Sequence, residues 1–455
     1  MRAALLFLVG VAAAALGAAP ASASSALWPQ PTRYSAQLRW DAHTHVLSGS
    51  EQIAFVNDGP STLSSVWLRV WPNGYGSCAH PWARVEVKRG GRLAARRAGC
   101  TALRVRLTRP IAAGSTGLVG MHLRVAVPQL SDRFGRDRGI VYLGNALPLL
   151  DVQEPAGPTL EPYSAVGDPF YSLVARWSVR LDMPRSLVAA TTGAVKSSQS
   201  MPHGYRRLRT EAGHARDFAI VLGRFVVDST VTDGGVLLRH YRPASEKRSA
   251  SLAALRVAQA AVEAYSSWYG TSGLDEIDLV PGPGDFGGFG SGMEYPGLVL
   301  TSEEPQVVAH ELAHQWWYSL VGDDQWRSPW LDESFAEFSS RRLPSSVVPD
   351  DGLKCDFANP VRPFGAALLT DSMHHWDAAG SYAYYREVYL GGTCALRSLE
   401  HDLGSDAMTA FLRSYVAAHR WGVVTTADFV AALRAAAPPG YDVDAFLRRA
   451  RITGS

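Results

Sequence analysis

Two histidines and a glutamate with metal-binding spacing stand out in the sequence. His310, Glu311 and His314 form an H-E-x-x-H motif within VVAHELAHQWW. Residues four apart on an α-helix differ by about 40° in rotation and about 6 Å along the axis, so both imidazoles leave one face of the helix and can bind one Zn²⁺. Glu311 points beside such a metal and can accept a proton from water without being a ligand. The motif predicts metal-assisted hydrolysis.

A third ligand follows in the sequence. Glu333 is separated from His314 by 18 residues and begins a second helical segment, WLDESFAEF, which can fold back against the first helix. Two histidines and one glutamate leave the fourth tetrahedral position open, which is typical of a catalytic rather than a structural zinc site. We therefore expect one Zn²⁺ per chain. Glu337, one turn after Glu333, either accepts the other N–H of a ligand histidine or is a solvated carboxylate.

These motifs fall in the second of two predicted domains. Residues 24–240 alternate apolar with polar side chains in short segments separated by Gly, Pro, Asn and Ser, which predicts an antiparallel β-sandwich. The period changes to a helical one in SASLAALRVAQAAVEAYSSWYG. Two short strands, IDLV and GLVLT, and then mainly helical sequence follow. We therefore place the second domain at residues 241–455.

The composition limits the partners of the chain. Of its 455 residues 47% are hydrophobic and 19% charged, which excludes a disordered chain. The 44 Lys and Arg residues nearly cancel the 42 Asp and Glu residues, leaving a formal net charge of +2. We therefore expect no nucleic-acid partner and no stable membrane association.

The N-terminus indicates export. Arg2 precedes an apolar run that ends in small residues, the order of a secretory signal peptide. We expect residues 1–23 to be removed by cleavage after Ala23, which gives a secreted protein. A retained membrane anchor is the alternative.

Export permits disulfides among the four cysteines. Four cysteines allow three pairings. If each domain pairs its own, the bridges are Cys78–Cys100 and Cys355–Cys394.

Three segments together resemble a known family. HELAHQWW, WLDESFAEF and GMEYPG (residues 292–297) are similar to the motifs of the M1 aminopeptidases, which belong to the gluzincin metallopeptidases. Weaker similarity covers nearly all of the mature chain. The resemblance implies a saddle-shaped β-sandwich followed by a thermolysin-like catalytic domain. Larger members carry a further helical domain, so the chain is expected to be a short form.

The resemblance also implies a binding role for GMEYPG. Gly292, Met293 and Glu294 would lie at the substrate-binding edge beside the zinc, where Glu294 receives the α-amine of a peptide. A carboxylate there selects chain ends through a charge-assisted hydrogen bond.

A tyrosine is expected to stabilise the oxyanion. Tyr389 aligns with the tyrosine of the family's Y-E-K-G motif, although Leu390 and Gly391 replace the Glu and Lys. Tyr384 and Tyr385 are therefore alternatives. Tyrosine suits the role because its ordinary pKa keeps the hydroxyl protonated at neutral pH.

Together these features predict a secreted zinc aminopeptidase that acts on peptides with a free N-terminus, with Glu311 as general base. A zinc endopeptidase, or another zinc hydrolase such as one acting on an epoxide, would keep the same metal residues. A binding protein on a peptidase fold is a third possibility, against which the intact H-E-x-x-H motif and Glu333 argue. The sequence does not predict the oligomeric state.

Overall fold

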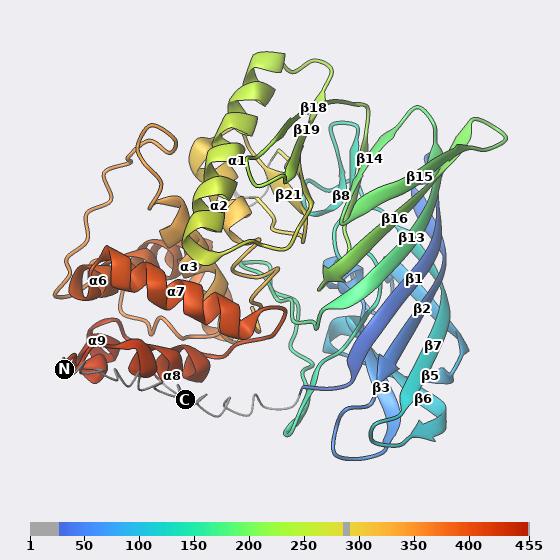
Figure 1. Cartoon of the computed structure of the whole chain (residues 1–455). Helices are drawn as coiled ribbons and strands as arrows, with labels where there is room; N and C mark the ends of the chain where they lie inside the picture. The colour runs from blue at the N-terminus through green and yellow to red at the C-terminus, as the bar shows by residue number, and fades with distance from the viewer. Residues whose placement is uncertain (1–26, 285–291, 454–455) are drawn as a thin grey trace, which may run out of the picture.

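The structure, a computed structural model, describes residues 27–284 and 292–453. The predicted signal peptide and its cleavage site lie outside the described residues. Figure 1 shows a strand-rich N-terminal half beside a half that contains the long helices. This agrees with the predicted order of a β-domain followed by a helical one.

The N-terminal half is built from stacked sheets. The largest has seven strands in the order β15-β16-β13-β1-β2-β7-β4. Its strands are β1 (Gln30–Asp41), β2 (Val46–Val56), β4 (Ala83–Arg89), β7 (Thr116–Ala126), β13 (Ala175–Pro184), β15 (Ala194–Ser200) and β16 (Tyr205–Ala215).

Smaller sheets complete this half. One has the order β10-β3-β6-β5 and another the order β14-β17-β9-β8, while β11 (Gln153–Glu154) pairs with β12 (Gly157–Pro158). The remaining strands are β3 (Leu63–Arg69), β5 (Gly91–Arg97), β6 (Ala102–Ile111), β8 (Phe134–Asp137), β9 (Ile140–Leu143), β10 (Leu149–Leu150), β14 (Val188–Thr191) and β17 (Ile220–Gly223). Two 3₁₀ turns, Trp71–Tyr75 and Ala98–Cys100, lie between strands.

Strand β1 shows why these sequences form a sandwich. Tyr34, Leu38 and Trp40 are buried in the core, whereas Gln37 and Arg39 are exposed. Successive side chains of a strand point to opposite faces, so this alternation covers one face of the sheet and leaves the other to solvent.

One pairing departs from the predicted antiparallel pattern. β1 and β13 run parallel, with Arg33 opposite Arg176 and Arg39 opposite Asp182. A parallel pair needs a long crossover connection, and here the chain between β1 and β13 forms β2, β4 and β7 of the same sheet as well as strands of the smaller sheets. Such a pairing depends on residues far apart in sequence, so the alternation of apolar and polar residues within one strand does not predict it.

The C-terminal half contains a four-stranded sheet and all the α-helices of the described residues. The sheet has the order β18-β19-β20-β21, formed by β18 (Phe225–Val231), β19 (Leu237–Pro243), β20 (Glu276–Pro281) and β21 (Leu298–Thr301). The predicted division at residue 240 therefore falls inside β19. Because β18 and β19 pair with the strands of the second half, we propose that the domain boundary lies before β18.

The helices of this half, as far as the structure describes it, lie beside this sheet or, for α6 to α9, away from it at the lower left of Figure 1. They are α1 (Arg248–Tyr269), α2 (Pro305–Ala313), α3 (Trp330–Ser340), α4 (Met373–Ala379), α5 (Ser381–Tyr384), α6 (Gly392–Leu403), α7 (Ser405–His419), α8 (Thr426–Ala436) and α9 (Val443–Arg449), with a π-helical turn at Tyr385–Gly391. In α1 the helical period buries Leu255, Val262, Tyr265 and Tyr269 on one side. No helix in the described ranges has the length and apolar content needed to cross a membrane.

Covalent and polar links hold the segments together. The disulfides Cys78–Cys100 and Cys355–Cys394 confirm the predicted pairing. Arg216, which is fully buried in the N-terminal half, donates hydrogen bonds to the carbonyls of Ser172 (3.1 Å) and Tyr318 (2.7 Å) and to that of Gly422. Tyr318 and Gly422 belong to the C-terminal half, so one guanidinium joins the two halves.

Candidate metal centre

The three predicted ligands converge between two helices. His310 lies on α2, His314 directly follows its last residue, and Glu333 lies in the first turn of α3. The Nε2 atoms of His310 and His314 are 3.0 Å apart, and Glu333 Oε2 lies 3.1 Å and 3.4 Å from them. Two imidazole nitrogens and one carboxylate oxygen so arranged match the donor set of a catalytic zinc site.

Each histidine is oriented through its other ring nitrogen. His310 Nδ1 lies 2.8 Å from Glu337 Oε2, and His314 Nδ1 lies 3.0 Å from the carbonyl oxygen of Trp317. With the proton on Nδ1, each ring donates to these acceptors and directs the Nε2 lone pair toward the shared position. The structure thus places Glu337 where a supporting carboxylate belongs. The sequence analysis missed the Trp317 carbonyl.

Glu337 is itself held in place. Arg341 Nε donates to Glu337 Oε1 (2.7 Å), and Gln306 Nε2 donates to Glu337 Oε2 (3.1 Å). Burial alone would raise the pKa of Glu337, but the His310 hydrogen bond and the charge of Arg341 outweigh it and lower the pKa to about 2. Glu337 is therefore an ionised acceptor at neutral pH.

Glu311 points into the site with an unused oxygen. Its side chain is buried, and Oε2 has no hydrogen-bond partner among the described residues. Burial raises the pKa of Glu311 to about 8, and the neighbouring carboxylates Glu294 and Glu333 act in the same direction. A carboxylate with a raised pKa and a free oxygen can take up and release a proton near neutral pH.

Gly292 makes room for Glu311. A Cβ atom at residue 292 would lie 2.4 Å from Glu311 Cγ and Cδ, which no side chain could occupy without displacing the glutamate. Met293 pairs with Leu300 of β21 through two backbone hydrogen bonds of 2.9 and 2.8 Å. The GMEYPG segment therefore runs along the sheet edge directly beside α2.

Glu294 also faces the site. It is 3% exposed, and it has a carboxylate oxygen within 4.8 Å of ligand atoms of both Glu311 and His314. Gln325 Nε2 donates to Glu294 Oε1 and to Asp332 Oδ2, both at 2.7 Å. Gln325 thus fixes two carboxylates, a role that the sequence did not reveal.

Tyr389 lies against the first ligand. Its ring is nearly parallel to that of His310, with centroids 5.5 Å apart. Burial, assisted by the charge of Glu333, raises the pKa of Tyr389 well above its usual value, so the hydroxyl stays protonated. Tyr384 and Tyr385 line the same cavity. Of the three predicted tyrosines, only Tyr389 stacks on a ligand histidine.

All the predicted site residues except Met293 line one cavity of about 210 Å³. Residues of the N-terminal half complete its wall, and none of them was predicted. They include Asp132, Arg133 and Asp168, of which Arg133 and Asp168 form an ion pair. The cavity therefore lies where the two halves meet, a position that cannot be read from motifs confined to the second half.

A β-sandwich half and a helical half meet at this site. The M1 zinc metallopeptidase of Deinococcus radiodurans is 20% identical and shares this fold, with a TM-score of 0.67 over 93% of each chain. Residues 298–449 match the model of the Peptidase family M1 domain.

Curated relatives match parts of the chain. A membrane alanyl aminopeptidase of Manduca sexta is 32% identical over 31% of this chain and 16% of its own length. Aminopeptidase M1-D of Oryza sativa is 26% identical over 58% of this chain and 32% of its own length. The matched part of the chain thus spans about a sixth and about a third of these relatives.

Proposed function

We propose that the protein is a secreted zinc-dependent aminopeptidase that hydrolyses N-terminal residues from peptides. The observation that carries the proposal is the convergence of His310, His314 and Glu333 beside the unpaired, buried oxygen of Glu311. The aminopeptidase relatives support the activity, and a related M1 zinc metallopeptidase of Deinococcus radiodurans is described as bound to the tripeptide Tyr-Ser-Ala. The signal-like N-terminus supports secretion.

In this mechanism His310, His314 and Glu333 hold the metal, and the other residues bind substrate and move protons. When bound, Zn²⁺ supplies Lewis-acid polarisation of the scissile carbonyl and of the attacking water. Glu311 accepts the proton of the attacking water and later delivers it to the departing amine. One carboxylate therefore serves first as base and then as acid.

Two further groups bind the substrate. The Glu294 carboxylate accepts hydrogen bonds from the α-ammonium group, which places the first peptide bond at the reacting position. Tyr389 donates a hydrogen bond from its hydroxyl to the carbonyl oxygen as that oxygen becomes negative. The carboxylates around Glu294 favour a cationic chain end over a neutral, acylated one.

Hydrolysis of a panel of aminoacyl-amide reporters by the Glu311→Gln variant tests the proposal. The variant should lose about 10²- to 10⁴-fold in kcat because the proton acceptor is gone, while elemental analysis finds zinc at the wild-type ratio. A chelator should abolish wild-type activity and added zinc should restore it. Wild-type turnover by the variant would refute the mechanism.

Two measurements separate the remaining parts of the proposal. N-acetylated reporters and internally cleaved peptides distinguish an aminopeptidase from an endopeptidase that uses the same metal residues. N-terminal sequencing of exported protein should begin at Ser24, the residue after the predicted cleavage site.

A further inference from the structure

The outer face of the seven-stranded sheet carries exposed arginines that oppose one another across neighbouring strands. The opposing pairs are Arg33 with Arg176, Arg180 with Arg209, and Arg84 with Arg124. The strand registers place Arg39 and Arg207 on the same side of the sheet. We call these eight residues the arginine face.

Like charges at opposing strand positions destabilise a sheet, because their Cβ atoms lie only about 4.5–5.5 Å apart. The carboxylates of this face do not relieve the repulsion at every pair. Asp182 pairs with Arg207 (2.7 Å) and Glu211 with Arg209 (2.6 Å). Within the described part of the chain, Arg33, Arg176 and Arg180 form no ion pair, nor do Arg84 and Arg124.

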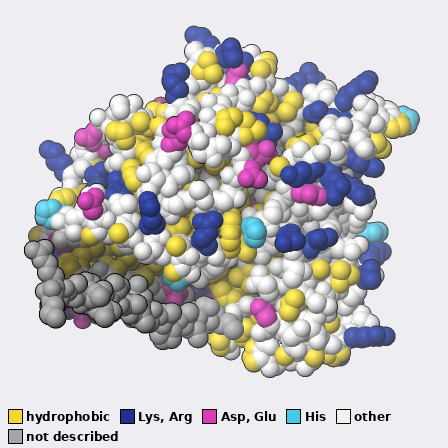
Figure 2. Space-filling view, viewed as in Figure 1, with side chains coloured by type: hydrophobic (Ala, Val, Ile, Leu, Met, Phe, Trp, Pro, Cys, Tyr) yellow, Lys and Arg dark blue, Asp and Glu magenta, His cyan; other side chains and the backbone are white. Residues whose placement is uncertain are grey.

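The positive charge is local rather than general. The whole chain has a formal net charge of only +2, so this concentration must be offset by negative charge elsewhere. Figure 2 shows Lys and Arg side chains crowded at the upper right, over the region where Figure 1 places β13, β15 and β16. A local concentration of positive charge attracts anions even when the net charge of the protein is small.

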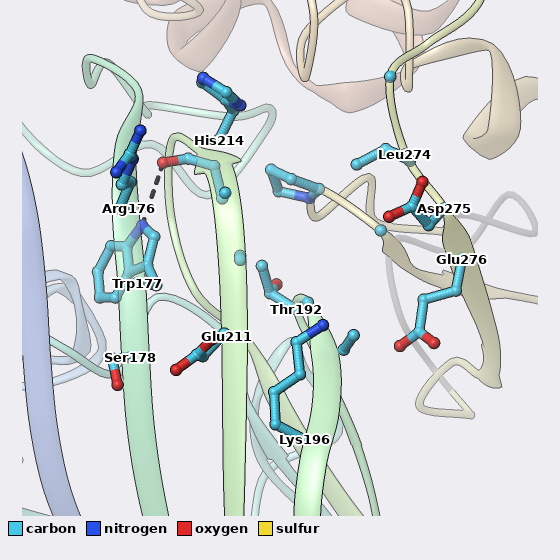
Figure 3. A pocket seen from close by; sticks show the side chains of 18 of the residues that line it. Arg176, Trp177, Ser178, Thr192, Lys196, Glu211, His214, Leu274, Asp275 and Glu276 are labelled. Carbon is cyan, nitrogen blue, oxygen red and sulfur yellow. Dashed lines mark hydrogen bonds between the residues drawn. The ribbon is translucent and has the colours of Figure 1, made fainter.

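A groove bounds the arginine face at one end. It has a volume of about 630 Å³, and its strand-side wall includes Arg33, Arg176 and Lys196. Figure 3 shows Lys196 on the strand side and Asp275 and Glu276 across the groove, on the segment that begins β20. These carboxylates repel anions, whereas the strand-side wall supplies the cationic side chains Arg33, Arg176 and Lys196.

We propose that the arginine face binds inorganic polyphosphate, a flexible, linear polyanion whose charges are phosphate groups. Residues on one face repeat about every 6.6–6.8 Å along a strand, and neighbouring strands lie about 4.8 Å apart, so guanidinium groups form a grid that successive phosphates can follow. Arginine presents paired N–H donors that match phosphate oxygens. A phosphate between opposing arginines replaces their repulsion by attraction.

The shape of the sheet favours a polymer over a bilayer surface. Neighbouring strands rotate by about 20–25° on average, so seven strands form a strongly twisted face. A flat bilayer meets only part of such a surface, whereas a flexible chain follows its twist. The exposed side chains that define the face are arginines, which do not supply apolar groups for insertion.

The test measures binding of long-chain inorganic polyphosphate to the mature protein. The wild type should bind at low salt, and its affinity should fall linearly with salt on a log–log plot as counterions are released. The double variant Arg33→Glu/Arg180→Glu should bind at least about tenfold more weakly and show a shallower salt slope. Arg256→Glu, an exposed arginine on α1, is the matched control and should change affinity less than about twofold.

Three results would overturn the proposal. The first is wild-type polyphosphate binding by the double variant or by the milder Arg33→Gln/Arg180→Gln, each verified as folded by its melting curve and peptidase activity. The second is binding to vesicles rich in phosphatidylglycerol without binding to polyphosphate, which would assign the face to a membrane. The third is tighter binding of single-stranded DNA of equal charge, which would assign the face to nucleic acid.

Discussion

At the scale of single residues, the proposed preference for substrates with a free N-terminal amine rests on Glu294. Its carboxylate is buried beside Glu311 and His314 and is fixed by Gln325. A buried negative charge so placed stabilises an ammonium group and gains nothing from a neutral amide. In the proposed mechanism, this carboxylate is the group that distinguishes a free N-terminal amine from an acylated one.

Glu294→Gln should weaken hydrolysis of substrates with a free amine far more than of amine-blocked ones. Loss of a hydrogen bond to a charged group, about 1.5–3 kcal/mol, corresponds to a rise of about 10- to 150-fold in KM. Steady-state kinetics on paired free and acetylated reporters measures the ratio. Glu304→Gln, an exposed glutamate just before α2, is the control. Equal losses on both substrates would contradict the role.

Tyr389→Phe should lower kcat by about 10²- to 10³-fold with little change in KM, because the hydroxyl acts only when the oxyanion forms. Tyr384→Phe and Tyr385→Phe should each cause a smaller loss, since neither ring stacks on a ligand histidine. Kinetics on one reporter compares all three variants. If Tyr384→Phe were the most impaired, the oxyanion role would pass to Tyr384.

At the scale of elements, two helices fix the metal centre. The four-residue spacing between His310 on α2 and His314 at its C-cap brings the imidazoles together. The same spacing in α3 places Glu333 and Glu337 on one side, so that one contacts Nε2 and the other Nδ1 of His310. These relations are local to a helix, which is why the sequence predicts them. Gln325 and the Trp317 carbonyl lie in irregular segments whose paths no periodic pattern specifies.

Glu337→Gln should reduce zinc affinity by about 10- to 100-fold, because the amide is a weaker acceptor for His310 and no longer supports its basicity. Competition against a chelator of known affinity measures the change. Glu303→Gln, on the exposed segment before α2, should retain wild-type affinity. Unchanged affinity in Glu337→Gln would show that His310 needs no such support.

Strand β2 contains a buried carboxyl group, that of Glu51, whose ionised form is destabilised by burial. Glu51 occupies an inward position between the buried Leu47 and Ile53, and neither carboxylate oxygen has a hydrogen-bond partner among the described residues. Burial raises the pKa of Glu51 well above its usual 4.5. The folded state therefore favours the protonated form, whose contribution to stability is fully present below pH 4.5 and decreases as the pH rises toward the folded pKa.

Glu51→Gln should remove this dependence. Relative to the variant, the wild type should lose up to about 1.4 kcal/mol of unfolding free energy per pH unit above 4.5, until the folded pKa is reached. Melting temperatures of both proteins at pH 5 and pH 8 measure the difference. If the melting temperature of the variant relative to the wild type did not rise between pH 5 and pH 8, Glu51 would not be buried in its protonated form.

At the scale of the whole molecule, the sequence predicts the two halves but not their contact. Alternation in β1 and the helical period in α1 identify both halves, because each pattern reflects burial within a single element. Two features depend on residues far apart in sequence, namely the parallel pairing of β1 with β13 and the position of Arg133 and Asp168 in the cavity wall. The arginine face likewise can be identified only once the pairing registers of the strands are known.

The buried guanidinium of Arg216 has a consequence for how substrates reach the cavity. It donates to carbonyls on both sides of the contact, and Gly322 leaves it space, since a Cβ there would lie 2.2 Å from Arg216 Cζ. Any hinge-like separation of the halves must first break these hydrogen bonds, whose donor is a charged group. We therefore propose that substrates reach the cavity without a separation of the two halves.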